Sequence, residues 1–247
     1  MKKVLPSDAQ PKPTSRRVAD VISALIITIT VVSLAFVTGV TVTQDKSTTS
    51  VGNFAIYKGS AERGGAALMF NVYEGCDIVM DILSILRKYS AKATFFIGGI
   101  WAENNAATLS AIAESGQEIG CHGYLHKDHA KLSVEQNKEE IAKTNRLIKE
   151  ITGKTVTLFA PPSGSFGDNA ETACRALGQK MILWTKDTID WRDADPDLLV
   201  KRATKNIASG DLILMHPKTQ TVKALPQIIE AYLAAKISLL TVSEVIQ

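Results

Sequence analysis

The stretch that decides the fold spans positions 116–129 and reads Gly116-Gln117-Glu118-Ile119-Gly120-Cys121-His122-Gly123-Tyr124-Leu125-His126-Lys127-Asp128-His129. Its first six residues have the pattern of a short strand. Three of the chain's four histidines follow, spaced His-x3-His-x2-His. Imidazole is the commonest protein ligand for zinc and related metals. Because parallel α/β folds place their chemistry at the carboxyl ends of strands, this stretch predicts a strand that ends in a metal site.

Short apolar runs alternate with helical patterns on both sides of this stretch. Strands are expected at 66–70, 92–97, 116–121, 155–160, 180–184, 211–215 and 237–242, and helices at 77–89, 103–114, 133–151, 168–177, from 195 onward and at 222–235. A capping box, Ser133 to Gln136, begins the longest helix. Seven strand–helix repeats with short connections favour a parallel (β/α)7 barrel. An open doubly wound sheet is the alternative, and it is weakened because the sequence lacks a glycine-rich nucleotide-binding loop.

The N-terminus has the pattern of a membrane anchor. Residues 21–42 carry no charged side chain, and a helix of this length crosses the roughly 30 Å hydrocarbon core. Basic residues precede it, which places the N-terminus in the cytoplasm. We therefore expect a cytoplasmic tail at 1–17, a single transmembrane signal anchor at 18–43, a polar linker at 44–60 and an extracytoplasmic domain at 61–247. A cleaved signal peptide is the competing interpretation, although no clear Ala-x-Ala site follows.

Composition excludes some classes of function. The chain has 247 residues and a net charge of +3, and its basic residues are spread along the sequence. No basic stripe with interleaved aromatic residues is present, so a nucleic-acid partner is not expected. The three cysteines are too few for a disulfide framework.

Polar residues also follow the other expected strands. They are Asn71 to Glu74, Pro162 to Gly164, Asp187 to Trp191, and His216. Each has a structural explanation of its own, since His216 precedes a proline and Asp190-Trp191 suits a surface turn. A barrel, however, gathers all carboxyl strand ends at one rim, together with His122 and His126. Their arrival at successive strand ends favours one shared site.

The order of these motifs resembles that of the NodB-type polysaccharide deacetylases, carbohydrate esterase family 4. The motifs that carry the resemblance, over about residues 65–245, are His122-x3-His126, Asp187-Thr188-Ile189-Asp190-Trp191, Leu212-Ile213-Leu214-Met215-His216 and, where the family has Arg-x-Pro-x-Gly, Ala160-Pro161-Pro162-Ser163-Gly164. The resemblance implies a distorted parallel (β/α)7 barrel, preceded here by one transmembrane helix.

The resemblance also implies a metal-dependent hydrolase that removes N-acetyl groups from an extracellular amino-sugar polysaccharide, peptidoglycan first or a chitin-like glycan. The cation would be zinc, or else cobalt, nickel or manganese, and His122 and His126 would bind it together with a carboxylate. His216 would be the catalytic acid, and Asp190 would stabilise its protonated form. The residues implied for the substrate groove are Trp191, Leu214, Pro162 and Ser163.

The first motif departs from the family's Thr-Phe-Asp-Asp-Gly, because this chain reads Met69-Phe70-Asn71-Val72-Tyr73-Glu74-Gly75. Alignment on Phe70 places Asn71 at the base position and Val72 at a metal-ligand position, and neither residue type can take that role. Ala160 replaces the arginine that braces the base. The residues expected to fill the gap are Glu74 as base or ligand, His129 as a third ligand, or Asp77. A catalytically degenerate domain that binds glycan or a wall partner without turnover is the alternative function.

Overall fold

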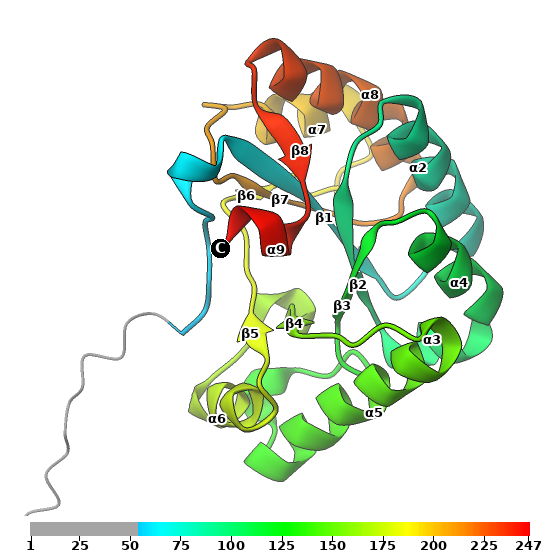
Figure 1. Cartoon of the computed structure of the whole chain (residues 1–247), viewed down its shortest axis with the longest axis vertical. Helices are drawn as coiled ribbons and strands as arrows, with labels where there is room; N and C mark the ends of the chain where they lie inside the picture. The colour runs from blue at the N-terminus through cyan, green and yellow to red at the C-terminus, as the bar shows by residue number, and fades with distance from the viewer. Residues whose placement is uncertain (1–53) are drawn as a thin grey trace, which may run out of the picture. The chain divides into compact units, whose positions relative to one another are not determined.

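The longest strand, β1 (Gly65–Val72), is buried along its whole length and lies inside the sheet with strands on both sides. The computed structural model describes residues 54–247, and its strand order is β5-β4-β3-β2-β1-β7-β6 with every pairing parallel (Figure 1). The other strands are β2 (Ala93–Ile97), β3 (Glu118–Cys121), β4 (Leu158–Phe159), β5 (Lys180–Met181), β6 (Lys186–Asp187), β7 (Leu212–Met215) and β8 (Ser238–Leu240), which pairs with the start of β1. The predicted parallel α/β fold is confirmed.

The sheet curls but does not close into the predicted barrel. Strands β5 and β6 stand at its two ends, and no pairing joins them within residues 54–247. Each has only two residues, too few to form a ladder across the remaining gap. Ile56 instead pairs in parallel with Ile182, just beyond β5, through bonds of 2.8 Å to Met181 and Leu183. The fold is therefore a curled parallel half-barrel, and the predicted distorted parallel (β/α)7 barrel is confirmed in part.

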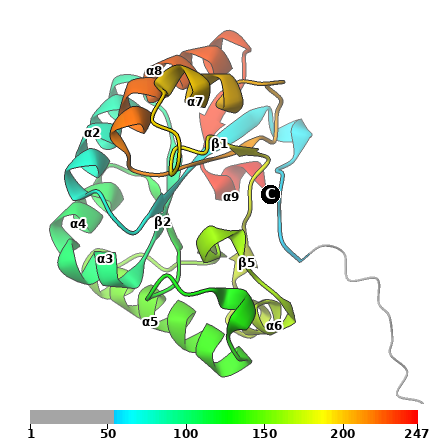
Figure 2. The same ribbon diagram turned by 180° about the vertical axis from the view of Figure 1, so that it is seen from behind.

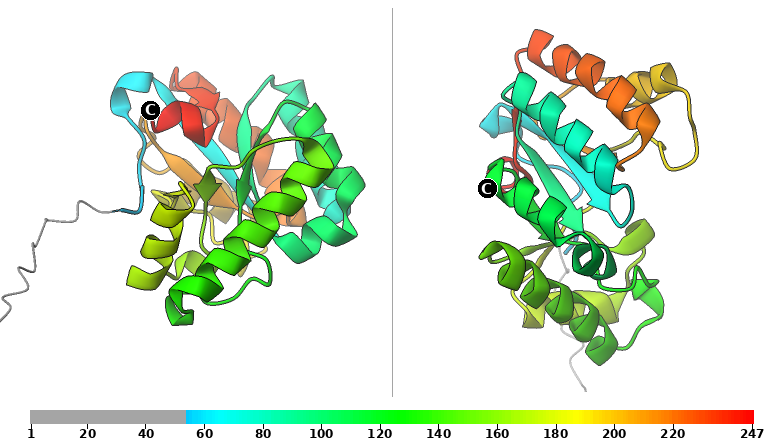
Figure 3. Two further views of the ribbon diagram at one scale, coloured as in Figure 1. Left: turned by 60° about the horizontal axis from the view of Figure 1, so that its bottom comes forward. Right: turned by 90° about the vertical axis from the view of Figure 1, so that its right-hand side faces the viewer.

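Helices cover the outer face of the curled sheet (Figures 1 and 2). They are α2 (Cys76–Lys88), α3 (Gly99–Asn104), α4 (Ala106–Glu114), α5 (Val134–Thr152), α6 (Asp168–Ala176), α7 (Pro196–Ala203) and α8 (Thr219–Ala234), with 3-10 turns η1 (Ala61–Arg63), η2 (His129–Lys131) and η3 (Pro162–Gly164). Helix α5 packs against α6, and α7 packs against α8 (Figure 3). The helix expected at 103–114 is two helices, because Asn105 has a non-helical φ of −135°.

Two apolar cores result from the alternation of side chains along β1. Leu68 and Phe70 point outward into the core under the helices, whereas Ala67 and Met69 point into the half-barrel. The short helix α9 (Val242–Val245) follows β8 and packs its two valines against this inner core. Its first backbone N–H donates to Thr94 near the start of β2, at 2.9 Å. Helix α9 thus fills the end of the half-barrel where the strands begin.

The predicted N-terminal segments fall mainly outside the described residues. This applies to the tail at 1–17, the anchor at 18–43 and the linker as far as 53. Between 54 and 247, no helix has the length and apolar character needed to cross a membrane. The end of the predicted linker packs on the domain, because Ala55 is buried and the Gly59 N–H donates to the Gly210 carbonyl at 2.8 Å. The folded domain therefore begins before the predicted boundary at 61.

Candidate active site

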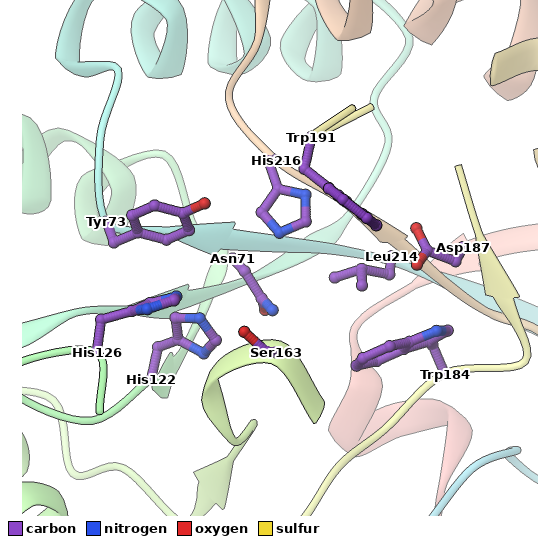
Figure 4. A pocket seen from close by; sticks show the side chains of 10 residues that line it. All are labelled: Asn71, Tyr73, His122, His126, Ser163, Trp184, Asp187, Trp191, Leu214 and His216. Atoms are coloured by element: carbon purple, nitrogen blue, oxygen red, sulfur yellow. The ribbon is translucent and has the colours of Figure 1, made fainter. Parts of the chain in front are cut away.

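A cavity of about 320 Å³ opens at the carboxyl ends of the strands (Figure 4). The side chains that line it are Asn71, Tyr73, His122, His126, Ser163, Trp184, Asp187, Trp191, Leu214 and His216. They come from β1, β3, β4, β5, β6 and β7 or from the loops that follow these strands. The rim predicted from the sequence is therefore a single site.

His122 follows β3 directly and is 1% exposed. Its Nδ1 lies 2.7 Å from the carbonyl oxygen of Ala160. Because a carbonyl can only accept, Nδ1 carries the proton, and Nε2 keeps a free lone pair. Nε2 is buried and has no hydrogen-bond partner among the described residues. Burial lowers the pKa of His122 well below its ordinary value, so the ring is neutral near pH 7. A neutral imidazole with one nitrogen anchored to the backbone is the form that binds metals.

His126 is held by a strained loop. Its φ of +54° lies in the left-handed region, which costs a non-glycine residue energy. Ser163 and Ile189 also have positive φ, of +56° and +57°, and they lie at or beside the same cavity. Strained backbone of this kind clusters at functional sites.

Tyr73 lies against the two histidines. Its ring centroid is 4.2 Å from that of His126 and 6.1 Å from those of His122 and His216. Figure 4 shows its hydroxyl pointing toward His216. Burial raises the pKa of Tyr73, with a further contribution from the charge of Glu74, so the phenol is protonated near neutral pH. Tyr73 therefore lies between the pair His122 and His126 and the ring of His216.

His216 and Asp190 form a buried pair on the opposite wall. The His216 Nδ1 lies 2.8 Å from Asp190 Oδ1, and the His216 backbone N–H donates to Oδ2 at 2.6 Å. The hydroxyl of Thr221 donates to the same Oδ2 at 2.6 Å. Asp190 is fully buried, so its charge is compensated by these three donors. The arrangement holds the imidazole in one orientation, with Nε2 directed at the cavity.

Besides Asp190, which contacts His216, three of the predicted site residues do not line the cavity. Glu74 forms an ion pair with Lys218, and its side chain is 43% exposed. His129 is fully buried, with its Nδ1 2.6 Å from Asn137 Oδ1 and its ring against Phe159. These contacts correct the expectation that Glu74 or His129 completes the site, because neither side chain lines the cavity, although His129 Nε2 is buried without a partner among the described residues. Pro162 is the buried first residue of η3 and does not line the cavity, whereas the next residue, Ser163, does.

Three residues that line the cavity had been assigned no role. Tyr73 shares the inward face of β1 with Asn71, because alternate residues of a strand point to the same side. Val72, between them, is in the outer core. Trp184 comes soon after β5, and Asp187 ends the two-residue strand β6. The signal for Trp184 was its place at the end of an expected strand, where an indole provides a flat apolar surface.

The residues present fit a divalent cation only in part. His122 and His126 face the cavity with imidazole nitrogens, and Asn71, whose carboxamide oxygen is buried, lines the same cavity. Across residues 54–247, however, no group of three or more His, Cys, Asp or Glu side chains is arranged to hold a metal ion. Any cation at this pair would therefore take its other protein ligand from a neutral oxygen.

Glu140, on α5, positions the loop that carries His126. Its Oε2 accepts the backbone N–H groups of Tyr124 and Leu125 at 2.8 and 2.7 Å, and Oε1 lies 2.9 Å from Lys127 Nζ. Burial opposes the charge of Glu140, but the donors outweigh it, so the pKa lies below its ordinary value. This stabilisation is complete above the ordinary pKa and is lost as the pH falls through the folded-state pKa.

Replacement of Glu140 by leucine is expected to lower the free energy of unfolding by about 3 kcal/mol, because two buried N–H groups lose their acceptor. Urea denaturation at pH 7 without added metal measures the change. Glu139, the exposed neighbour on the same helix, is the matched control, and its leucine variant should change stability by less than about 0.5 kcal/mol. Equal effects of the two substitutions would contradict the role assigned to Glu140.

Comparisons with known proteins agree with this geometry. The family model for polysaccharide deacetylases matches residues 58–182. A peptidoglycan-N-acetylglucosamine deacetylase of Bacillus cereus is 30% identical over 68% of this chain and 81% of its own length. The uncharacterized protein YlxY of Bacillus subtilis is 38% identical over 70% of this chain. The match covers 54% of YlxY, so this chain spans about half the length of that relative.

The similar solved structures include a non-catalytic relative. BA3943 of Bacillus anthracis, described as a CE4 family pseudoenzyme, has a TM-score of 0.76 and 35% identity over 78% of this chain and 69% of its own. A mutant of BA3943 with restored enzymatic activity has the same TM-score and 34% identity. The fold, the histidine pair, the His216–Asp190 pair and these similarities together show that the chain belongs to the polysaccharide deacetylase family, the NodB or CE4 deacetylases, which act on carbon–nitrogen bonds other than peptide bonds.

Proposed function

We propose that this domain removes N-acetyl groups from an amino-sugar polysaccharide, with peptidoglycan as the first substrate, and that it needs a divalent cation. One observation carries the proposal. The buried His216–Asp190 pair faces His122 and His126 across one cavity (Figure 4). An acid and a cation-binding pair on opposite walls suit an acetamide held between them.

Hydrolysis of one acetamide consumes one water, breaks the bond between carbonyl carbon and nitrogen, and releases acetate and a free amine. His216 would donate the proton that the leaving nitrogen requires, from the Nε2 that faces the cavity. Asp190 would keep the ring oriented through its bond to Nδ1. A bound cation would polarise the acetyl carbonyl. Zinc is our first choice, because imidazole ligands suit it, and cobalt, nickel and manganese are tested beside it.

The aromatic residues of the cavity suit a sugar ring. Trp191 is 52% exposed and Trp184 is half-buried, and both line the cavity next to Leu214. Indole faces stack against the apolar faces of sugars, while a leucine offers a dry contact for an acetyl methyl group. Ser163 supplies a hydroxyl beside His122 (Figure 4).

We further propose that the domain works outside the cytoplasmic membrane, held by a single N-terminal anchor. The support is the uncharged stretch at 21–42 with basic residues before it. Peptidoglycan is found on that side of the membrane, so the substrate and the expected topology agree.

Acetate release tests the proposed hydrolysis directly. The full chain in detergent is incubated with N-acetylglucosamine oligomers or purified peptidoglycan, together with Zn²⁺, Co²⁺, Ni²⁺ or Mn²⁺. We expect release with at least one of these cations, and a chelator should abolish it because the protein alone leaves the carbonyl unpolarised. If no cation supports release although the chain still binds the glycan, hydrolysis is wrong, and the domain is a glycan-binding member without turnover.

A further inference from the structure

Asn71 has a buried oxygen with no partner. The residue is 2% exposed and lines the cavity from the inward face of β1. Its Oδ1 is fully buried and makes no hydrogen bond with any described residue. Buried polar atoms are almost always paired, so an unpaired one calls for an explanation. The apolar inner core below, which includes Met69, offers no donor that would satisfy it.

A second unpaired atom lines the same cavity. His122 Nε2 is buried without a partner within residues 54–247, and it is an acceptor because Nδ1 donates to Ala160. Asn71 Oδ1 can also only accept. Both atoms carry a free lone pair, and neither receives a hydrogen bond from the described part of the chain. A divalent cation can accept lone pairs from two such atoms at once. Figure 4 shows the carboxamide of Asn71 and the ring of His122 turned toward the same part of the cavity.

The carboxylates near the histidines are engaged or remote, and the Ser163 hydroxyl beside His122 belongs to an exposed residue. Asp187 Oδ1 accepts the Ile189 N–H at 2.7 Å, and Asp187 lies beside Trp184 on the far side of the cavity (Figure 4). Glu74 is paired with Lys218. Asn71 is therefore the buried oxygen donor beside the pair that remains available within the described part of the chain.

We propose that the Asn71 carboxamide oxygen is the third protein ligand of a divalent cation bound by His122 and His126. This inference rests on the proposed function, since it specifies the composition of the cation site. All three ligands would be neutral, so the full charge of the cation would remain in the cavity. Affinity should be lower than with a carboxylate, because a charged ligand adds attraction that a carboxamide lacks.

The position of Tyr73 is compatible with this site. Its ring lies against the face of the His126 ring, with the two planes tilted by 46°. An imidazole binds a metal through a lone pair in the plane of the ring, so a contact on the face leaves that direction open. The contact also restricts the rotation of His126, which helps to hold the ligand in place.

Cation affinity tests the assignment without relying on turnover. Isothermal titration calorimetry of the full chain in detergent with ZnCl₂ gives the dissociation constant, and the visible spectrum of the Co²⁺-loaded protein reports its ligands. We expect Asn71→Asp to bind Zn²⁺ at least about tenfold more tightly and Asn71→Leu at least about tenfold more weakly than the natural chain. The Co²⁺ bands should also change in both variants.

Asn145 provides a matched control, because its Oδ1 is likewise buried and has no partner in the described part of the chain, but it lies on α5 outside the cavity. Asn145→Leu should leave the affinity and the Co²⁺ spectrum unchanged. Thermal melts without metal confirm that each variant is folded.

The outcomes separate the inference from the proposed function. If Asn71→Leu and Asn71→Asp bind Zn²⁺ like the natural chain, while the chain still releases acetate, the assignment of Asn71 is wrong and the proposed hydrolysis stands. If the natural chain binds neither Zn²⁺ nor Co²⁺ and releases no acetate, both fail. Tighter binding by Asn71→Asp and weaker binding by Asn71→Leu support the assignment, whether or not acetate is released.

Discussion

Alanine in place of His216 is expected to lower the rate of acetate release at least about 100-fold, because loss of a general acid costs a factor of this order. Asp190 is fully buried, and it bonds both the imidazole Nδ1 and the backbone N–H of His216, whose ring is the group on that wall placed to protonate a leaving nitrogen. The effect should appear in kcat, since the proton is needed at bond cleavage and not for glycan binding. Acetate release is measured at saturating glycan with the preferred cation. The ratio of the rate of the natural chain to that of His216→Ala then gives the contribution of the His216 side chain to kcat.

The control for this variant is the Zn²⁺ affinity. His216 lies across the cavity from His122 and His126, so His216→Ala should bind Zn²⁺ as the natural chain does. A loss of acetate release with normal Zn²⁺ affinity identifies an acid rather than a ligand. If His216→Ala keeps its rate within about threefold, well under the effect of a general acid, the assignment of His216 is incorrect.

Much of the fold follows from local pattern. Strands β1 to β5 and β7 each overlap an apolar run that the sequence marks as a strand. The capping box of Ser133 and Gln136 is formed at the start of α5, as the sequence predicts. Local sequence pattern could not predict whether the sheet closes into a barrel or stays open. Closure depends on how strand twist adds up across the sheet, and on strand pairing at β5 and β6, which are only two residues long. Helix α9 was missed for a related reason, because four residues give too short a periodic signal.

Motif spacing placed most of the candidate site, since His122, His126, Ser163, Trp191, Leu214 and His216 all line the cavity. It failed where the direction of a side chain depends on tertiary contacts. Spacing shows that His129 is three residues from His126, but not that η2 turns its ring toward Asn137. Likewise, the sequence around Glu74 does not indicate that its carboxylate pairs with Lys218, which is 144 residues away.

Period-two alternation along β1 would have corrected one assignment. The family alignment directed attention to Val72 as the missing ligand, but Val72 belongs to the outer core. Asn71 and Tyr73 occupy the inward face instead. In this chain, the first motif therefore presents the carboxamide of Asn71 and the phenol of Tyr73 to the cavity. Hydrolysis by this site requires that these two groups support a bound cation.

Alanine in place of His122 is expected to weaken Zn²⁺ binding at least about 100-fold, more than the loss of an outer-shell partner. The bond from Nδ1 to Ala160 fixes the ring with Nε2 unprotonated and directed at the cavity. Removing the ring therefore removes a ligand that needs no reorganisation before it binds. Calorimetric titration of the full chain in detergent measures the loss, and acetate release should disappear with it.

His129 is the matched control, because it belongs to the same histidine stretch but packs against Phe159 and bonds to Asn137. His129→Gln should keep the Zn²⁺ affinity within about twofold, since no ligand is removed, and should lower the free energy of unfolding by about 1 kcal/mol through the weakened buried hydrogen bond. The opposite result, a large loss of affinity in His129→Gln and a small one in His122→Ala, would place the cation at the outer end of the stretch. The two variants thus distinguish a metal site built on the strand end from one built on the loop, a choice that the His-x3-His-x2-His spacing leaves open.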